Sequence, residues 1–394
     1  MNHYDYVVIG AGVIGTSVAY HLTKLGAKRV VLIEQQAIGS GTTSQSSGIL
    51  RTHYSVKENV ELARASWDIF NHFPSYLGDE DASCGLVKCG YLICAPEGQR
   101  LEPLRAALET QTAMGIEVKV LSGQEAAERL PIAQFDDAAL IGFEPEAGFA
   151  DPYLVTTSFA RSARRLGAHV LQGTRVTGLV WNGRRILGVE TTAGRINCGT
   201  VISTQNIWSS ELATWMGARL PVHAERHAVL ALECEAGYSA AMPVLKDLGS
   251  AGMLYYRSYG GHQMLVSEGT AGESLESLET EQTDISLDTI TAVGDQVVKR
   301  FPAYEAAGLA SSWSGIYDVT PDWNPVLGTI ADFEGLVVGF GFSGHGFKLS
   351  PAVGKLLAQC ALERPTDFSL RPYAIDRFDK GILLRGRYGG GAVS

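Results

Sequence analysis

Residues 4–34, YDYVVIGAGVIGTSVAYHLTKLGAKRVVLIE, decide the fold. A short apolar run leads into Gly10, Gly12 and Gly15, a helix-like segment follows, and a second apolar run ends on Glu34. This order predicts a strand, a glycine-rich turn, a helix and a second parallel strand, the unit that binds a dinucleotide. The motif by itself does not distinguish FAD from NAD.

Each glycine of this turn has its own expected role. Gly10 allows the tight turn, Gly12 lets the backbone approach a pyrophosphate, and Gly15 lets the helix pack closely on the strand. The first helical residues, Val13 and Ile14, lie where backbone N–H groups and the positive end of the helix dipole favour phosphates. The alternative is a βαβ unit whose glycines only make a turn.

The acid at the end of the second apolar run narrows the choice of cofactor. Glu34 lies 24 positions after Gly10, where a carboxylate hydrogen-bonds an adenosine ribose. The same carboxylate would repel a 2′-phosphate, so NADP is disfavoured.

Length and composition limit the function classes. A chain of 394 residues exceeds the size at which one core keeps growing, so two domains are expected. The formal net charge of -10, without a basic patch, argues against a nucleic-acid partner or an anionic membrane surface. The six cysteines lack metal-ligand spacing, so we expect reduced thiols and no metal site.

We expect no targeting segment at the N-terminus. No basic stretch precedes its apolar run, and glycines interrupt that run, so we expect neither a signal peptide nor a membrane span. A cytoplasmic location follows from this interpretation.

A second glycine turn lies near the other end of the chain. Residues 339–351, GFGFSGHGFKLSP, again read as strand, turn and helix, with the helix expected to open at Ser350 and Pro351. A second helix N-terminus offers N–H donors to an electron-rich group. A nicotinamide dinucleotide would not need it, whereas a reduced flavin carries negative charge that it would stabilise. This turn therefore favours FAD.

Apolar periodicity predicts an α/β (α+β) fold with two domains that are discontinuous in sequence. We assign residues 1–84, 146–219 and 311–394 to a Rossmann-like FAD-binding domain. Residues 85–145 and 220–310 have a different pattern of apolar residues from these segments. They form the candidate substrate domain, with a mixed β-sheet.

Four motifs together carry a family resemblance. They are residues 10–15 (GAGVIG), 41–54 (GTTSQSSGILRTHY), 318–328 (DVTPDWNPVLG) and 341–358 (GFSGHGFKLSPAVGKLLA). The chain resembles the FAD-dependent amine oxidoreductases of the D-amino-acid oxidase superfamily over about residues 4–365. Within that family it is most similar to the sarcosine oxidases, both the monomeric forms and the β subunit of heteromeric forms.

The resemblance implies a two-lobe fold in which the substrate sheet covers the flavin ring. It implies that Arg51 and Lys348 hold a substrate carboxylate, that Tyr317 lines the same pocket, and that Tyr255 or Tyr256 lies on the flavin-facing strand. It also implies that the backbone of Val176 meets the adenine. The remaining expected cofactor contacts are Thr42, Thr43, Ser44, Ser47, Gly48, Gly344, Gly346 and Phe347.

Each of these residues has an alternative role. Arg51 suits a phosphate clamp or a solvated loop equally well, and Lys348 could cap a strand or pair with an acid. The tyrosines lie in strand-like runs, where aromatic residues usually pack. His345 and His53 could influence the proton of the substrate amine, or could only satisfy backbone groups of their turns.

Two departures from the family pattern affect the flavin. Gly315 stands where monomeric sarcosine oxidases attach the flavin to a cysteine, and Gln45 or Ser46 replaces an attachment histidine, so we expect non-covalent FAD. The strand after Gly260 and Gly261 reads HQMLVSE and carries no lysine, where the oxidases place one over the flavin. This departure argues against a fast reaction with oxygen.

The sequence therefore predicts an FAD-dependent amine oxidoreductase. We expect hydride transfer from a small secondary or N-methyl amino acid, similar to sarcosine, proline or dimethylglycine, to give an imine that water hydrolyses. The alternatives are an FAD monooxygenase fed by NAD(P)H and a flavin-holding subunit of a heteromeric dehydrogenase. Homo-oligomers and partner subunits are both left open.

Overall fold

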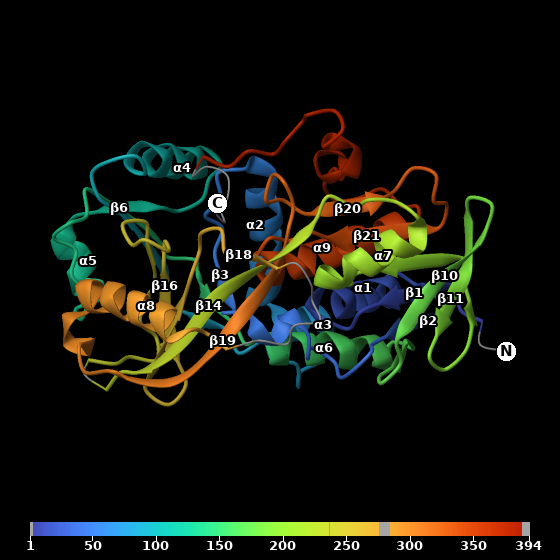
Figure 1. Ribbon diagram of the computed structural model, residues 1–394, viewed down its shortest axis with the longest axis horizontal. Coiled ribbons are helices and arrows are strands. Elements are labelled where there is room, and N and C mark those ends of the chain that lie inside the picture. Colours follow the sequence, from blue (N-terminus) through green and yellow to red (C-terminus); the bar gives the residue numbers. More distant parts are fainter. Residues whose placement is uncertain (1–2, 236, 276–283, 388–394) are drawn as a thin grey trace.

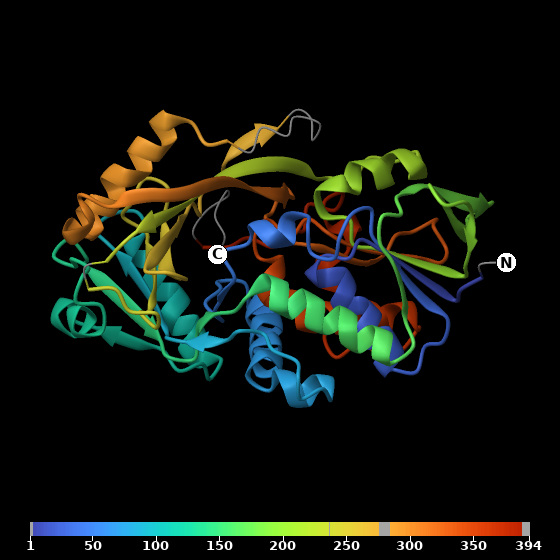
Figure 2. The same cartoon turned by 90° about the horizontal axis from the view of Figure 1, so that it is seen from below.

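The computed structural model describes residues 3–235, 237–275 and 284–387, and it has two lobes built on two large sheets (Figure 1). The N-terminal βαβ unit lies in the first lobe. The mixed sheet of the second lobe lies beside it, and the long strands β14 and β19 extend from the second lobe toward the first (Figures 1 and 2).

The first lobe contains a six-stranded sheet in the order β20-β21-β13-β1-β2-β9. Its strands are β1 (Tyr6–Ile9), β2 (Val30–Ile33), β9 (His169–Leu171), β13 (Thr200–Ser203), β20 (Val326–Thr329) and β21 (Leu336–Phe340). All neighbours run parallel except β20 and β21. Because α1 (Val13–Lys24) connects β1 to the parallel strand β2, the predicted βαβ unit is confirmed.

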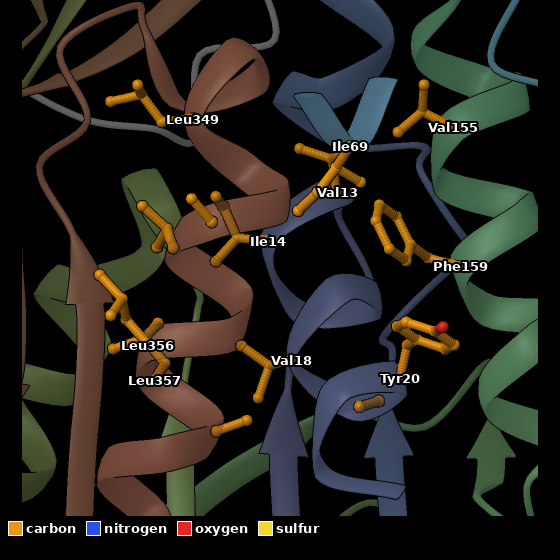
Figure 3. Close-up of a cluster of buried hydrophobic side chains, with 14 of the residues drawn as sticks. Val13, Ile14, Val18, Tyr20, Ile69, Val155, Phe159, Leu349, Leu356 and Leu357 are labelled. Atoms are coloured by element: carbon orange, nitrogen blue, oxygen red, sulfur yellow. The ribbon is translucent and has the colours of Figure 1, made fainter. Parts of the chain in front are cut away.

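Three helices form the core beside this sheet. Helix α1 lies between α6 (Pro152–Arg165) and α9 (Gly346–Ala361), and their apolar side chains interdigitate (Figure 3). Helices α9 and α1 lie close together at Gly354 and Ser17, since a Cβ added to Gly354 would lie 2.1 Å from the Ser17 Oγ. The first and the last predicted glycine motifs are thus packed together.

The second lobe contains a sheet in the order β18-β14-β17-β16-β15-β5-β7-β6, with β19 paired to β14. Its strands are β5 (Tyr91–Ala95), β6 (Lys119–Leu121), β7 (Leu140–Glu144), β14 (His223–Glu233), β15 (Val244–Asp247), β16 (Tyr255–Tyr259), β17 (Gln263–Ser267), β18 (Glu273–Leu275) and β19 (Gly308–Val319). The pair β5–β15 is parallel and the other pairs are antiparallel, so the predicted mixed sheet is confirmed.

Shorter elements connect the lobes and cover their faces. The strands are β3 (Ile49–Leu50), β4 (Val87–Lys88), β8 (Gly148–Phe149), β10 (Val176–Asn182), β11 (Arg185–Thr191) and β12 (Ile196–Asn197). The helices are α2 (Lys57–Asn71), α3 (Phe73–Leu77), α4 (Leu101–Ala113), α5 (Gly123–Arg129), α7 (Ser209–Met216) and α8 (Leu287–Arg300). The short 3-10 turns are η1 (Thr42–Gln45), η2 (Asn206–Trp208), η3 (Pro302–Tyr304), η4 (Arg371–Tyr373) and η5 (Ile375–Arg377). None of the helices in these ranges is both long and apolar enough to cross a bilayer.

Two details differ from expectation. Helix α9 begins at Gly346, so the predicted start at Ser350 was wrong. Pro351 lies inside the helix. The glycine turn immediately before Gly346 sets the start, and the helix tolerates the loss of one backbone hydrogen bond at the proline. Strand β19 spans residue 311, where the expected domain boundary lay, and pairs with β14. We therefore propose that the substrate domain extends to Val319.

Candidate active site

A cavity between the lobes is lined by residues of both. One end is lined by Gly10, Gly12, Glu34 and Val176 at the carboxyl ends of the first-lobe strands. The other end is lined by residues of the long second-lobe strands and of the second glycine turn, namely Val229, Ser267, Gly315, Tyr317, Gly344, Gly346 and Phe347. Both predicted glycine turns therefore face one cavity.

The first glycine turn is sterically tight. Gly10 has a φ of +93°, and a Cβ added to Gly15 would lie 1.8 Å from the Gly10 carbonyl oxygen. The Val13 N–H donates to the Thr43 Oγ1 at 3.1 Å, which holds the next loop against the start of α1. Side chains larger than hydrogen at Gly10 and Gly15 would separate the helix from the strand.

The Glu34 carboxylate is fixed at the cavity wall. Its two oxygens accept hydrogen bonds from the Ala11 N–H at 2.8 Å and from the Gln36 N–H at 2.9 Å. Carboxylate oxygens each have a second lone pair, so the group can still accept a hydrogen bond from a ligand in the cavity.

In the hydroxyl-rich loop after β2, some side chains line the cavity and others hydrogen-bond to the protein itself. Thr42, Thr43 and Ser47 line the cavity, and Thr42 Oγ1 donates to the Asn206 Oδ1 at 3.1 Å. Other members of the predicted set do not line it: Gly15, Ser44, Gly48 and Lys348. The Ser44 hydroxyl donates to the carbonyls of Ser40 and Gly41 instead.

The second glycine turn is held by Asp318. Its buried carboxylate accepts hydrogen bonds from the Gly341 N–H and, at 3.1 Å, from the Phe342 N–H, while burial raises its pKa to about 7. Gly344 has a φ of +82°, and an added Cβ would lie 2.2 Å from the Tyr317 Cε2. The segment around Tyr317 and the glycine turn therefore form one rigid unit.

Arg51 is buried among tyrosines rather than solvated. Only 3% of its surface is exposed. Its Nη2 lies 3.4 Å from the Tyr255 hydroxyl, and its Cζ lies 4.7 Å and 5.7 Å from the ring centroids of Tyr54 and Tyr91. The burial removes the solvated-loop alternative for this arginine. Tyr255, and not Tyr256, lies on the face of the second sheet that contacts it, because Tyr256 packs into the opposite core.

Lys348 carries a buried amine. It lies in the first turn of α9 and is 8% exposed. It makes no hydrogen bond or ion pair with any residue that the structure describes, so no acid neutralises it there. Burial lowers the pKa of its amine well below the usual value, and the charges of Arg51 and Lys246 lower it further.

The two predicted histidines are buried and neutral. His345 Nε2 lies 2.8 Å from the Trp323 carbonyl oxygen, and His53 Nδ1 lies 2.7 Å from the Gln111 Oε1. Burial, followed by the charges of Lys348 and Arg51 respectively, lowers the pKa of each imidazole to about 3. His345 thus hydrogen-bonds a backbone carbonyl, which is the structural alternative to a role in moving the amine proton.

Two residues that the sequence did not single out join this site. His227 of β14 stacks on Tyr317, with ring centroids 3.9 Å apart and an angle of 25° between the planes. The Lys246 Nζ lies 3.5 Å from the centroid of the Tyr255 ring. The strand after Gly261, β17, carries no lysine, as expected, but β15, two strands away in the same sheet, supplies Lys246.

Comparison with known proteins assigns the family. The protein-family model described as "FAD dependent oxidoreductase" matches residues 5–360. Human mitochondrial sarcosine dehydrogenase is 29% identical over 396 residues, which are 98% of this chain and 42% of that protein. The chain thus spans less than half the length of that relative.

Other relatives are covered nearly end to end. The sarcosine oxidase subunit beta of Arthrobacter sp is 26% identical, over 99% of this chain and 95% of that protein. The crystal structure of L-proline dehydrogenase from P. horikoshii has a TM-score of 0.88 at 26% identity, over 97% of this chain and 99% of that one. The glycine oxidase structure from Geobacillus kaustophilus, at 23% identity and a TM-score of 0.84, shares the fold.

Proposed function

The chain belongs to the family of FAD-dependent oxidoreductases, and from this premise we propose that it oxidises the C–N bond of a small secondary or N-methyl amino acid. The product is an imine, which water hydrolyses to an amine and a carbonyl compound. The observation that carries this proposal is the buried guanidinium of Arg51 beside the Tyr255 hydroxyl, together with the buried amine of Lys348 next to the cavity-lining Phe347.

The cavity has the features that FAD requires. We assign the ADP half to the end with Gly10, Gly12, Glu34 and Val176. Gly12 lines this end without a side chain, so its backbone is open to a pyrophosphate. The flavin end is assigned to the residues on β19 and the second glycine turn, namely Gly315, Tyr317, Gly344, Gly346 and Phe347.

We propose that the cofactor is held without a covalent bond. Gly315 has no side chain for attachment, and the Gln45 Oε1 accepts a hydrogen bond from the Ile316 N–H at 2.9 Å. Acid precipitation of the protein should release all of the flavin into the supernatant. Flavin that stays with the precipitate would contradict this proposal.

The side chains bind and orient the amino acid. Arg51 offers a guanidinium fork to the substrate carboxylate, and Lys348 adds a point charge. FAD, when bound, supplies the acceptor for a hydride from the carbon beside the nitrogen. Tyr255 and Tyr317 exclude water from that carbon.

The charge of the pocket also selects the form of the amine. A neutral amine is needed for hydride loss, and the guanidinium of Arg51 disfavours a further positive charge beside it. The neutral imidazoles of His227 and His345 add no negative charge that would retain the ammonium form. The pocket therefore promotes loss of the amine proton on binding.

An anaerobic titration tests the proposal. Sarcosine, proline and dimethylglycine are added separately to the yellow flavin-loaded protein, and at least one should bleach the absorbance near the flavin maximum. A flavin that no member of a broad amino-acid panel reduces would refute the proposed reaction. Bleaching by NADH without any amine would instead support the monooxygenase alternative. Mixing the reduced protein with oxygen then reports whether oxygen is the acceptor.

A partner-dependent form of this function is supported by one relative. A protein named as a β subunit matches this chain over 95% of its own length. Co-expression with neighbouring gene products, followed by size-exclusion chromatography and the same titration, tests this form. The cytoplasmic location also stays a proposal, because the human relative is named as mitochondrial.

A further inference from the structure

Arg175 and Glu211 form an ion pair at the end of the cavity that we assign to the ADP half of FAD. Both residues line the cavity, as does the neighbouring Val176. The Arg175 Nη2 donates to the Glu211 Oε1 at 2.7 Å. The two side chains are 54% and 26% exposed, so the pair lies where the cavity meets solvent. The proposed amine chemistry uses neither residue.

The backbone of Arg175 is fixed independently of its side chain. Its N–H donates to the Thr192 Oγ1 at 3.1 Å, and its carbonyl accepts from the Thr192 N–H at 2.9 Å. The N–H of the preceding Thr174 donates to the Glu34 carbonyl at 2.9 Å. Arg175 therefore lies one residue beyond a contact with Glu34, whose carboxylate we expect to bind the ribose. In an adenine dinucleotide the base follows the ribose.

The side chain of Arg175 is held from a second wall of the cavity. Glu211 lies in the first turn of α7, where the helix dipole favours an acid. Helix α7 contacts β10, the strand that begins at Val176. The ion pair thus joins the two walls that flank this end of the cavity.

Charge compensation argues against a phosphate contact for this arginine. Of the described residues that line the cavity, Arg175 is the only lysine or arginine. Glu211 already offsets its charge, whereas the start of α1 offers phosphates its backbone N–H groups. A guanidinium hydrogen-bonds through its edge, so the bond to Glu211 leaves its faces for a planar ring.

The aromatic residue of the same wall packs toward the first glycine turn. Trp208 also lines the cavity, and a Cβ added to Gly41 would lie 3.3 Å from the Trp208 Cζ3. The loop that contains Gly41 is tied to the start of α1, because the Thr43 Oγ1 accepts from the Val13 N–H. Arg175 is therefore the flat side chain that follows directly on the Val176 backbone.

We propose that Arg175 binds the adenine ring of FAD, with the face of its guanidinium against the base and with Glu211 holding it in that orientation. Arg175 is then a cofactor-binding residue and Glu211 is a positioning residue. A guanidinium gains stacking and cation–π energy from an aromatic base. The inference depends on FAD as the cofactor of the family and not on which amine is oxidised.

Ligand binding to the flavin-free protein tests this assignment. The apoprotein is titrated with FAD, followed by flavin fluorescence, and with ADP, followed by calorimetry. ADP contains the adenine but no flavin. Arg175→Ala should weaken both ligands by the same factor, at least about fivefold, which is the lower end of the range for stacking one base. Unchanged affinities would overturn the proposal, and so would a loss for FAD without a loss for ADP.

Two further variants separate the flat face from the charge. Arg175→Tyr keeps a flat face without the charge, so its ADP affinity should stay within about threefold of the wild type. Arg175→Lys keeps the charge without a flat face and should lose nearly as much affinity as Arg175→Ala. The opposite order, with affinity kept by lysine and lost by tyrosine, would mean that the charge acts on the phosphates, and the proposal would be wrong.

The role of Glu211 is tested in two backgrounds. Glu211→Gln should weaken ADP binding less than Arg175→Ala does, and it should have no effect when Arg175 is already alanine, because the carboxylate acts only through the guanidinium. Additive losses in the double variant would refute the positioning role.

A matched control comes from the same lobe. Arg184→Ala breaks an exposed ion pair with Asp332, and neither residue lines the cavity. Both affinities should remain those of the wild type. A loss as large as that of Arg175→Ala would show that the effect is not local, and the assignment of the adenine contact would fail.

This test is independent of the proposed reaction, because it involves neither an amine nor turnover. If Arg175→Ala weakened ADP binding while no amino acid reduced the flavin, the adenine contact would stand and the reaction would be refuted. If amino acids reduced the flavin and the Arg175 variants bound ADP as the wild type does, the reaction would stand and the contact would be wrong.

Discussion

The imidazole of His227 stacks on the phenol ring of Tyr317, with 3.9 Å between the ring centroids. The two residues come from the paired strands β14 and β19, and the same phenol contacts the backbone of Gly344. Burial, followed by the charge of Lys246, lowers the pKa of His227 to about 4, so the imidazole is neutral at physiological pH. The contact therefore joins the second sheet to the glycine turn through aromatic packing and not through charge.

Removal of this stacking should loosen Tyr317. We expect His227→Ala to raise KM by about two- to tenfold, because an aromatic pair contributes about 0.5–1.5 kcal/mol. His227→Phe keeps an aromatic ring in the stack and should remain within about twofold of the wild type, on the same scale. Steady-state kinetics with the substrate found in the titration measure both. Equal losses in the two variants would show that the imidazole itself acts on the substrate.

The substitution Gly344→Ala should disable the flavin end of the cavity. The added methyl would lie 2.2 Å from the Tyr317 ring, and alanine disfavours the observed φ of +82°. We expect flavin content to fall at least about tenfold, given the typical cost of such overpacking and strain. Gly217→Ala is the matched control, because Gly217 has a φ of +62° but no atom within 4 Å of an added Cβ. A flavin-replete Gly344→Ala protein would contradict this prediction.

Loss of the Arg51 guanidinium should weaken carboxylate binding. We expect Arg51→Met to raise KM about ten- to hundredfold with a smaller change in kcat, since a hydrogen bond to a charged group contributes about 1.5–3 kcal/mol. Arg51→Lys keeps the charge without the planar fork, so its KM should lie between those of the wild type and of Arg51→Met. Arg64→Met, on the exposed side of α2, serves as the control. Unchanged kinetics in Arg51→Met would mean that the carboxylate assignment is wrong.

A buried ion pair should stabilise the first lobe near its C-terminal segment. Arg377 donates to both carboxylate oxygens of Asp322, at 2.8 Å and 2.9 Å, and both side chains are almost fully buried. Arg377→Met leaves the Asp322 charge uncompensated and should lower the free energy of unfolding by about 3–5 kcal/mol. Lys380→Met removes an exposed pair with Asp376 and should change the free energy of unfolding far less, because solvent screens that pair. Urea unfolding followed by circular dichroism compares them, and similar losses would refute the distinction.

Acid should destabilise the protein through its buried neutral histidines. Burial lowers the pKa of His21 from 6.5 to about 3, and its ring contacts the Ser17 carbonyl oxygen and the Tyr76 hydroxyl. Between these pH values the unfolded chain binds a proton that the folded chain does not, so stability falls as pH decreases from about 6.5 toward 3. Each such histidine contributes a slope approaching 1.4 kcal/mol per pH unit.

A substitution isolates the share of His21 in this slope. In His21→Gln, the difference in unfolding free energy between pH 6 and pH 5 should be smaller than in the wild type by about 1 kcal/mol. His72→Gln, at an exposed position, should leave the difference as it is. An unchanged pH dependence in His21→Gln would mean that this imidazole is not the neutral group described.

The parts of the fold with local signals could be predicted from the sequence. Gly10, Gly12 and Gly15 lie next to one another in the chain, between a strand and a helix whose periodicities are also local. The second glycine turn has the same property. The start of α9 was misplaced because a serine and a proline are equally typical of a first turn, and only the Asp318 contacts fix the turn before them.

The missing residues depend on long-range pairing. Lys246 follows two apolar residues in a short strand. No feature of the neighbouring sequence indicates that this strand pairs with β5 and β16, which places the lysine beside Tyr255. His227 becomes part of the site only because β14 pairs with β19. The same pairing moves the proposed domain boundary, since a strand pattern does not reveal which sheet the strand joins.

The contact between α1 and α9 has a consequence for synthesis of the chain. Val13, Ile14 and Val18 are translated long before the helix that covers them with Leu356 and Leu357 (Figure 3). The nascent chain therefore carries an uncovered apolar stripe until α9 has been made. The core of the dinucleotide-binding unit closes only when residue 361 has been added.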